Sequence, residues 1–343
     1  MRTATIQSFG GLRFVFVMLV FMSHYSWGDT PMFDFGGDCG VAFFFMLSGF
    51  GLMNGYGDRA VDGSLDTRRF VLRRLRRIYP MHLVAMVFAA VAIPWSFVDA
   101  KADVAAILLL QSWSADAYFA TNGPSWFLST LIVLYLLFPL MARCVGRMSL
   151  RGAVMLAVAL LVLMTAVYAA TACAHIDKDA ATRWLYVFPP ARIVDFLLGI
   201  VVFRLCRAAA PRVVDLSTRT ANALQTVSMV LTAALVPIYY AVGIPWELGA
   251  IFWLPMAAVI AVFVLTDGKG LTARLMSSRI LRCLGGISME IFLLHVPVIT
   301  ALHRLDAHLP FDIGYLGGLA VSLALTLPLA AAVHALLRRL KLA

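Results

Sequence analysis

Residues 6–27 read IQSFGGLRFVFVMLVFMSHYSW, an apolar run of membrane-spanning length that is interrupted by Arg13 and His24. These two residues are eleven positions apart. At ~100° per residue, eleven steps end only ~20° past three full turns, so both side chains share one face of a helix. The rise between them is roughly 16 Å, about half the thickness of the hydrocarbon layer.

A charged side chain inside a membrane span is costly and usually faces the protein interior or a water-filled cavity. We therefore expect the shared face of Arg13 and His24 to line a polar path, with the cation low and the titratable ring high. In the alternative interpretation, Arg13 extends to the cytoplasmic interface and His24 caps the far end of the helix. This stretch alone does not decide between the two.

The composition of the whole chain is that of a polytopic membrane protein. Of its 343 residues, 62% are hydrophobic and 13% are charged, and the mean hydropathy is +0.89. No soluble domain needs that much apolar surface. We predict an all-α fold, one integral-membrane domain over residues 1–343, with about ten transmembrane helices. The predicted spans are 6–27, 38–55, 78–98, 126–143, 153–172, 189–206, 222–242, 248–266, 285–303 and 314–337.

The placement of charge supports this count and predicts the orientation. With the N-terminus inside, 22 of the 28 Lys and Arg fall in cytoplasmic segments and four in outer segments. This asymmetry is typical of a multi-pass protein of the cell membrane with both termini cytoplasmic. It also assigns the net charge of +10 to the lipid bilayer and not to nucleic acid. The stretch 104–113 is apolar but too short to span, so we expect an interfacial or re-entrant helix there.

A run of arginines precedes the third predicted span. Six arginines lie within residues 68–77, at the cytoplasmic mouth of that span. Arg73/Arg76 and Arg74/Arg77 have the i, i+3 spacing of neighbours on a helix. Such pairs suit bidentate contacts to a polyphosphate. The alternative is an anchor for anionic lipid headgroups, a need that one or two arginines would meet.

Other polar residues interrupt later spans. Arg192 and Asp195 are i, i+3 neighbours, either a structural ion pair or groups that orient a reactant near His24. Glu290 and His295 both fall within the ninth span but ~140° apart, so at most one need line a cavity with His24. We interpret His82 and His334 as structural.

Several small or aromatic residues have simpler interpretations. Gly49, Gly51 and Gly55 are expected to let helices approach closely. Trp126 is expected at the outer membrane interface, where Trp is common. The five cysteines show no metal-ligand spacing, so no metal cofactor is expected.

Taken in order, these segments resemble the membrane-bound acyltransferase-3 family, which O-acylates cell-envelope glycans and related molecules. The matching pieces are Arg13-x10-His24, GVAFFFMLSGF at 40–50, the Arg run closing in Arg77-Ile-Tyr-Pro80, Trp126…Tyr135…Phe138-Pro139, and ISMEIFLLH at 287–295. The resemblance extends from residue 13 to about 297, and the family's ten-helix core agrees with the span count.

The resemblance implies that His24 is the catalytic histidine. It implies that Arg13 and the run containing Arg73, Arg74, Arg76 and Arg77 serve the acyl donor, usually acyl-coenzyme A and by default acetyl-coenzyme A. The chain departs from many members in carrying Ala42 after Gly-Val and Leu131 five positions after Trp126, where those members have acids. Asp38, Asp195 and Glu290 are then the candidates for an assisting acid.

Two classes of function fit the sequence. An acyltransferase needs a base for the acceptor hydroxyl and cations for the phosphates of the donor, and His24 and the arginines supply both. On this hypothesis Asp195 and Glu290 assist catalysis, while Trp126, Arg192 and His295 contact a hydroxylated envelope glycan. The second hypothesis is a transporter or flippase for an envelope glycolipid or organic anion, which also explains ten spans with buried polar groups. It does not explain six arginines at one mouth.

Overall fold

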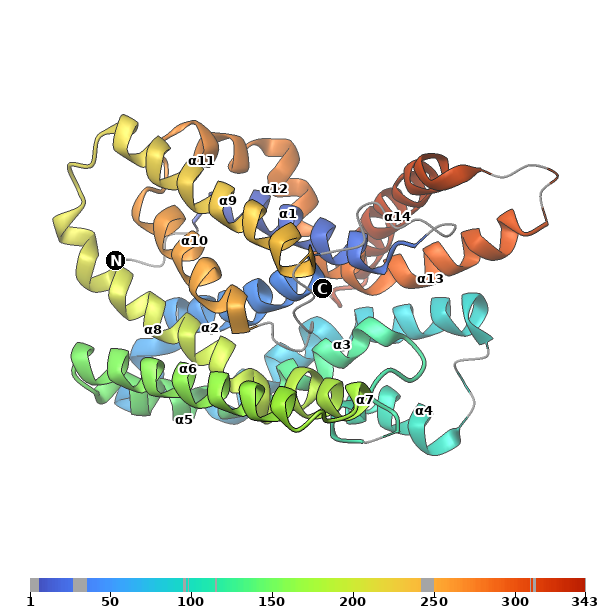
Figure 1. Cartoon of the computed structure of the whole chain (residues 1–343), viewed down its shortest axis with the longest axis horizontal. Helices are drawn as coiled ribbons and strands as arrows, with labels where there is room; N and C mark the ends of the chain where they lie inside the picture. Colours follow the sequence, from blue (N-terminus) through green and yellow to red (C-terminus); the bar gives the residue numbers. More distant parts are fainter. Residues whose placement is uncertain are drawn as a thin grey trace. The chain divides into compact units, whose positions relative to one another are not determined.

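The computed structural model describes residues 6–26, 36–94, 97, 99–114, 116–241, 250–308, 310 and 313–342. Most of the connection between the first two predicted spans therefore lies outside the described residues, as do both chain ends. The described residues form helices and no strands, which confirms the all-α prediction (Figure 1).

The described chain contains fourteen α-helices. Their bounds are α1 Ser8–His24, α2 Gly37–Asp62, α3 Thr67–Ala92, α4 Ala100–Ile107, α5 Trp126–Arg147, α6 Leu150–Cys173, α7 Lys178–Ala181, α8 Ile193–Ala209, α9 Thr218–Ala241, α10 Trp253–Leu265, α11 Leu271–Met276, α12 Arg279–Gly286, α13 Ser288–Asp306 and α14 Gly314–Arg339. Short 3-10 helices lie at Gln111–Trp113, Gly123–Ser125, Pro189–Arg192 and Ala210–Arg212, and a π-helix at Thr182–Val187.

Among the described residues, seven helices are long and apolar enough to cross a membrane. They are Gly37–Asp62, Thr67–Ala92, Gly123–Arg147, Leu150–Cys173, Thr218–Tyr239, Ser288–Asp306 and Gly314–Arg339. The other three predicted spans fall on α1, α8 and α10, which have 17, 17 and 13 residues. A helix of 17 residues is ~25 Å long, slightly less than the hydrocarbon thickness. The chain is therefore a multi-pass helical protein, while the count of ten and the orientation of the termini stay predictions.

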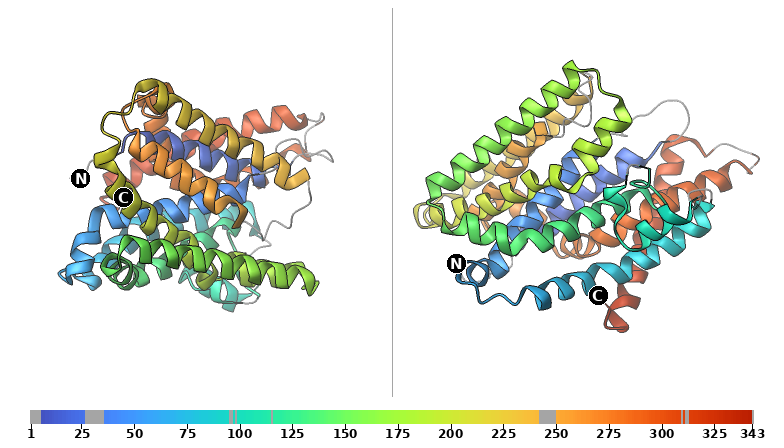
Figure 2. Two further views of the ribbon diagram at one scale, coloured as in Figure 1. Left: turned by 60° about the vertical axis from the view of Figure 1, so that its left-hand side comes forward. Right: turned by 90° about the horizontal axis from the view of Figure 1, so that it is seen from below.

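The chain divides into two compact units. Unit 1 comprises Met1–Phe16, Asp38–Thr67 and Leu134–Gly286, and unit 2 comprises Val17–Gly37, Arg68–Val133 and Ile287–Ala343. In unit 1, α8 packs against α6 and α10, and α10 packs against α9. In unit 2, α13 packs along α14, the orange and red helices of Figure 2.

Close packing in unit 1 depends on glycine where helices meet. A Cβ on Gly49 of α2 would lie 2.1 Å from the carbonyl oxygen of Phe196, and one on Gly199 of α8 would lie 1.9 Å from that of Met46. The expectation of close approach is therefore confirmed for Gly49. It is wrong for Gly51 and Gly55, because a Cβ there would meet no described atom within 4 Å.

The two ends of α1 are held by different partners. In unit 1, Ser8 Oγ donates to Asp267 Oδ1 at 3.3 Å, which sets a carboxylate near the helix N-terminus, where negative charge is favourable. Burial raises the pKa of the Asp267 carboxyl, and the hydrogen bond from Ser8 opposes that rise. In unit 2, Tyr25 donates its hydroxyl to the Tyr315 carbonyl at 2.5 Å and packs with Phe21 against Ile299 and Leu302. The C-terminal end of α1, where His24 lies, is thus fixed against α13 and α14.

The stretch predicted to be re-entrant or interfacial forms short helices, as its length required. It contains α4 and the 3-10 helix Gln111–Trp113. His82 Nε2 donates to the Ala106 carbonyl at 3.0 Å, and Ser129 Oγ donates to the Leu109 carbonyl at 2.8 Å. Buried polar contacts thus hold this segment to α3 and α5, because backbone that is not helical needs partners inside the protein at membrane depth.

Candidate active site

His24 occupies the last turn of α1, and its side chain is exposed. Its Nδ1 lies 2.8 Å from the carbonyl oxygen of Val20. A carbonyl oxygen only accepts hydrogen bonds, so Nδ1 must be the protonated nitrogen of the ring. The neutral imidazole therefore keeps its lone pair on Nε2. His24 presents a proton acceptor on an exposed ring, which is what a general base requires.

A second histidine lies against the first. The ring centroids of His24 and His295 are 4.9 Å apart, with the ring planes at 70°. His295 comes from α13 and is fully buried, and its Nδ1 lies 3.1 Å from the Ile291 carbonyl. By the same reasoning its lone pair is on Nε2. That atom has no hydrogen-bond partner among the described residues. Of Glu290 and His295, it is His295 that meets His24.

Glu290 faces a different neighbour. Its carboxylate lies 2.6 Å from Nδ1 of His334, and its side chain is 2% exposed. The prediction that Glu290 and His295 occupy different faces agrees with these contacts. The pair joins α13 to α14. His334, which the sequence suggested to be structural, therefore has a carboxylate partner that the sequence did not reveal. A catalytic role for Glu290 stays a prediction.

A buried polar cluster lies where α5 begins. Gln111 Nε2 donates to Ser125 Oγ at 3.1 Å, and Ser112 Oγ donates to the Trp126 carbonyl at 2.9 Å. Trp126 itself is only 5% exposed. The placement of Trp126 at the outer membrane interface stays a prediction. The ring of Phe127 beside it packs at a tilt against that of Phe292 of α13, with centroids 5.1 Å apart.

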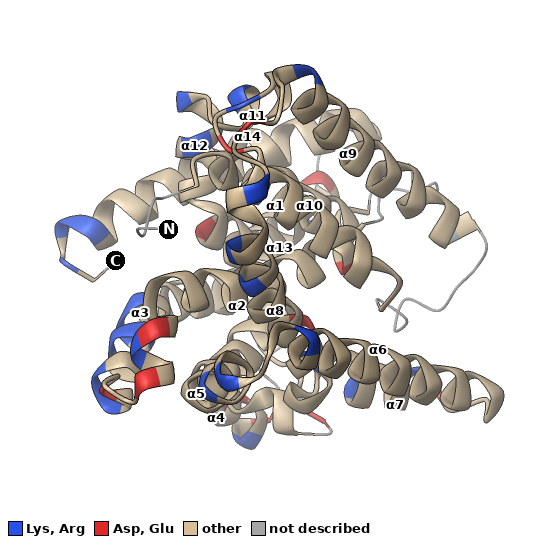
Figure 3. Cartoon of the chain, turned by 90° about the vertical axis from the view of Figure 1, so that its left-hand side faces the viewer, with Lys and Arg blue, Asp and Glu red and all other residues tan. Residues whose placement is uncertain are grey.

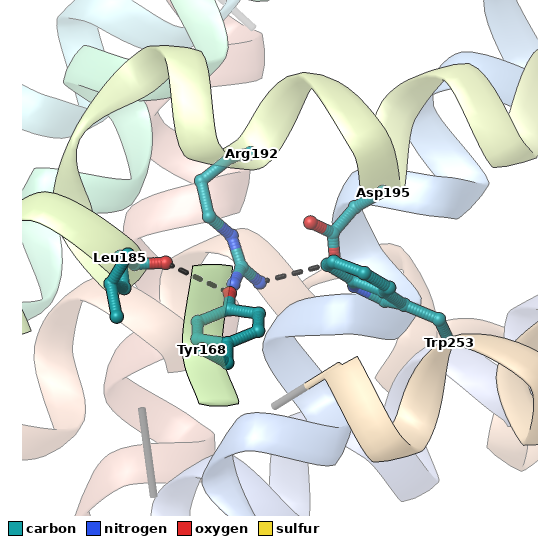
Figure 4. A network of polar contacts seen from close by, with 5 residues as sticks. All are labelled: Tyr168, Leu185, Arg192, Asp195 and Trp253. Atoms are coloured by element: carbon teal, nitrogen blue, oxygen red, sulfur yellow. Dashed lines mark hydrogen bonds and ion pairs between the residues drawn. The ribbon is translucent and has the colours of Figure 1, made fainter. Parts of the chain in front are cut away.

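Unit 1 holds the other polar group that the sequence singled out. Arg192 Nη2 and Asp195 Oδ1 are 3.2 Å apart, so the expected i, i+3 contact is present (Figure 4). Trp253 Nε1 donates to the same carboxylate oxygen at 2.8 Å. The guanidinium lies over the rings of Phe45 and Tyr186, 5.1 Å from each centroid. Trp253, from α10, is a member of this network that no local sequence spacing could reveal.

This network is closed. Arg192 is 1% exposed and Asp195 is fully buried. Arg192 Nε and Nη1 and Asp195 Oδ2 have no hydrogen-bond partner among the described residues. The backbone before Arg192 changes from a π-helix to a 3-10 helix before α8 begins. Asp195 and Arg192 belong to unit 1 and His24 to unit 2, so their predicted cooperation with His24 stays a prediction.

The arginines of the predicted donor site lie on the first turns of α3, which begins at Thr67, well before the predicted span (Figure 3). Arg73, Arg76 and Arg77 are exposed, whereas Arg74 is partly buried with its guanidinium over Phe70. Arg13 is half-buried on α1.

Arginines of unit 1 behave differently from those on α3. Arg143 donates to the Ala60 carbonyl at 3.4 Å and Arg147 to the Val61 carbonyl at 3.3 Å. Both carbonyls belong to the last turn of α2, where backbone acceptors lack helical partners. Arg204 similarly donates to the carbonyls of Val145 and Met148 at the end of α5. These cations therefore donate to backbone carbonyls at helix ends.

The described residues contain no group of three or more His, Cys, Asp or Glu side chains that could hold a metal ion.

Comparison with known proteins decides the class of enzyme. The family model for the acyltransferase domain of the acyltransferase-3 family matches residues 6–335. The chain belongs to the acyltransferase-3 family. A curated relative, Acyltransferase MdmB of Streptomyces mycarofaciens, is 29% identical over 334 residues, which cover 89% of this chain and 81% of the relative. No solved structure matches the chain.

Membership of the acyltransferase-3 family confirms the resemblance seen in the sequence and makes the chain an acyltransferase. With its apolar helices, it is a membrane acyltransferase. The matched range includes Arg13, His24, the arginines of α3 and the His295 segment. The family supports an acyl donor as co-substrate and leaves the donor and the acceptor to be argued from the site.

Proposed function

We propose that the protein moves an acyl group, by default acetyl, from cytoplasmic acyl-coenzyme A to a hydroxyl of an envelope glycan or related acceptor at the cell membrane. His24 is the general base. The observation that carries this proposal is the state of the His24 ring, with Nδ1 committed to the Val20 carbonyl and Nε2 left as an acceptor on an exposed side chain.

The chemical step follows from that arrangement. The acceptor hydroxyl gives its proton to His24 Nε2 as its oxygen attacks the thioester carbonyl carbon. The tetrahedral intermediate collapses with cleavage of the carbon–sulfur bond. The proton on Nε2 passes to the departing thiolate, so that coenzyme A leaves as the thiol and His24 returns to its neutral form. No acyl-enzyme is needed for this balance.

The donor phosphates would be held by arginines. Arg73, Arg76 and Arg77 are exposed. Arg143 and Arg147, by contrast, donate to backbone carbonyls at the end of a helix. Guanidinium groups bind phosphate through paired, charge-assisted hydrogen bonds. We assign Arg73, Arg74, Arg76 and Arg77 to the donor, with Arg13 further along the path on α1. With the predicted orientation, these arginines lie on the cytoplasmic side, where acyl-coenzyme A is found.

The acceptor would meet His24 from the outer side. His295, next to His24, and Trp126, on the segment packed against α13, are the proposed acceptor-side residues. The contacts of Arg192 and Asp195 favour the structural alternative, and those of Glu290 favour a link to α14. A transporter or flippase has no supporting observation beyond the buried polar groups.

His24 is tested by two substitutions. General base assistance typically contributes about 10²- to 10⁴-fold, so His24→Ala should lower kcat by about that factor. His24→Gln keeps a hydrogen bond but takes no proton, and should be equally poor. Release of free coenzyme A from acetyl-coenzyme A, with methyl glycosides as acceptors, measures turnover, and acetyl-coenzyme A binding should stay within about twofold.

Two results would redirect the assignment. A folded His24→Ala protein with wild-type turnover would remove His24 from catalysis and make His295 the next candidate. An acetylated His24 trapped without acceptor would replace direct transfer with an acyl-enzyme.

A further inference from the structure

A proline lies two residues after His295. Pro297 is inside α13 and has no backbone N–H. In a regular α-helix that N–H would donate to the carbonyl four residues earlier, which is the carbonyl of Leu293. Leu293 is fully buried. A buried carbonyl without a donor costs free energy comparable to a lost hydrogen bond.

The Leu293 carbonyl receives a donor from outside its own helix. Asn122 Nδ2 lies 2.9 Å from it, in a contact that joins residues 171 positions apart in the chain. Asn122 is fully buried and directly precedes the 3-10 helix Gly123–Ser125. The amide of Asn122 therefore supplies the hydrogen bond that Pro297 removes.

The position of Asn122 is costly in two respects. Its Oδ1 is buried without a partner among the described residues. The residue before it, Thr121, has φ of 63°, a left-handed conformation that a β-branched residue rarely adopts. Thr121 is held there by hydroxyl contacts to the Ala120 carbonyl at 2.7 Å and Met86 Sδ at 3.1 Å. Strain of this kind persists where the surrounding structure over-determines it, and it clusters at functional sites.

What the contact holds is the segment of α13 that carries His295. Leu293 and Pro297 flank His295 on both sides, and the His295 ring packs on His24. We propose that Asn122 is a positioning residue for the acyl-transfer site, which locks the proline-interrupted turn of α13 and so fixes the His24–His295 pair. This proposal deepens the proposed function and rests on His24 as the base. It gives a reason for a strained, polar segment inside an apolar unit.

A double-mutant cycle tests the lock, because Pro297→Ala gives the Leu293 carbonyl a helical donor again. Asn122→Ala should lower kcat roughly 10- to 100-fold, since small misplacements of catalytic groups have effects of that size. The Michaelis constant for acetyl-coenzyme A should stay within about twofold. Pro297→Ala alone should change kcat by less than about threefold, and the double variant should resemble Pro297→Ala, not Asn122→Ala.

Ser129→Ala is the matched control. Ser129 is also fully buried and donates to a backbone carbonyl, that of Leu109, which lies outside α13. Ser129→Ala should lower the melting temperature, and adding Pro297→Ala should not restore it. If Asn122→Ala does not fold, Asn122→Leu takes its place, since its side chain is of similar size but cannot donate.

The outcomes are distinct. Restoration of kcat by Pro297→Ala supports the lock. Full kcat in folded Asn122→Ala, or a double variant as impaired as Asn122→Ala, overturns it. The same cycle read by thermal unfolding in detergent needs no activity. If His24→Ala keeps turnover while Asn122 and Pro297 remain coupled in stability, the general-base proposal fails and the lock itself stands.

Discussion

The His24–His295 pair in unit 2 and the Arg192–Asp195 network in unit 1 both set polar side chains among apolar helices. They differ in what they leave available. His24 is exposed, and the hydrogen bond of its Nδ1 to the Val20 carbonyl leaves Nε2 as an acceptor. Arg192 and Asp195 are enclosed, with the guanidinium between two aromatic rings and the carboxylate bonded to Trp253. Chemistry needs a reactive atom that a substrate can reach, and the first region has one.

A buried charge need not be a catalytic one. In the unit 1 network, removing one partner leaves the other as an uncompensated buried charge, whereas replacing both removes the cost. In unit 2, the reactive ring contributes little to the core, so its loss should affect turnover more than folding. Substitutions in the unit 1 network should therefore lower mainly stability, whereas substitutions at the His24–His295 pair should lower mainly turnover.

The largest expected effect is on the unit 1 network. Arg192→Met should lower the free energy of unfolding by roughly 3–5 kcal/mol, because Asp195 is then buried without its counter-ion. Arg192→Met combined with Asp195→Asn should recover most of that loss, since the amide is neutral and its oxygen still accepts from Trp253. Unfolding in a detergent and denaturant series measures both.

Turnover of the double variant decides the role of the network. A structural pair predicts kcat within about threefold of wild type once the protein is folded. A stable double variant that has lost acceptor turnover would assign Arg192 and Asp195 to substrate or catalysis instead.

The arginines provide the next test. Arg73→Gln with Arg76→Gln should raise the Michaelis constant for acetyl-coenzyme A about 10- to 100-fold, because charge-assisted contacts to phosphate are lost. Arg143→Gln with Arg147→Gln is the matched control, since it removes the same charge from helix-capping positions. The control should lower stability and leave the donor constant nearly unchanged. Equal effects of the two double variants would return the α3 run to the role of a lipid anchor.

A smaller effect on turnover is expected from the second histidine. His295→Ala should lower kcat about 10-fold through loss of the ring that fixes His24. His295→Phe keeps a ring of similar size and should recover part of that loss. If Phe is as poor as Ala while both variants are folded, the nitrogen of His295 takes part in the chemistry, and the pH profile of kcat should then differ from wild type.

Much of the fold could be predicted because local patterns decide it. Apolar length placed helices at all ten predicted spans, and the i, i+3 rule predicted the contact of Arg192 with Asp195. The rotation between Glu290 and His295 followed from helical periodicity and agrees with their separate partners. Arg13 and His24 were found because a charge in an apolar run is conspicuous.

What the sequence could not supply is contact between distant segments. Asn122 and Leu293 are 171 positions apart, and Trp253 and Asp195 are 58 apart. Pro297 does indicate that the Leu293 carbonyl lacks its helical donor, but no local pattern names the donor. The burial of Trp126 likewise depends on packing between segments, which no local spacing reveals. Membrane length alone also did not foresee that irregular turns would shorten α8.

The smallest effect on turnover is expected from the hydrogen bond that joins α10 to the unit 1 network. Trp253→Phe removes the indole donor to Asp195 Oδ1 and keeps an aromatic ring beside Tyr168, whose ring centroid lies 6.2 Å from that of Trp253. A hydrogen bond to a charged group is worth about 1.5–3 kcal/mol, so the free energy of unfolding should fall by roughly that amount. In the Arg192→Met, Asp195→Asn background the acceptor is neutral, and the same change should cost only about 1 kcal/mol. The kcat of the folded protein should not change in either background, because the hydrogen bond of Trp253 is expected to affect only the free energy of unfolding. A loss of kcat in folded Trp253→Phe would show that the closed network reaches the chemistry after all, and would remove the distinction between the two regions.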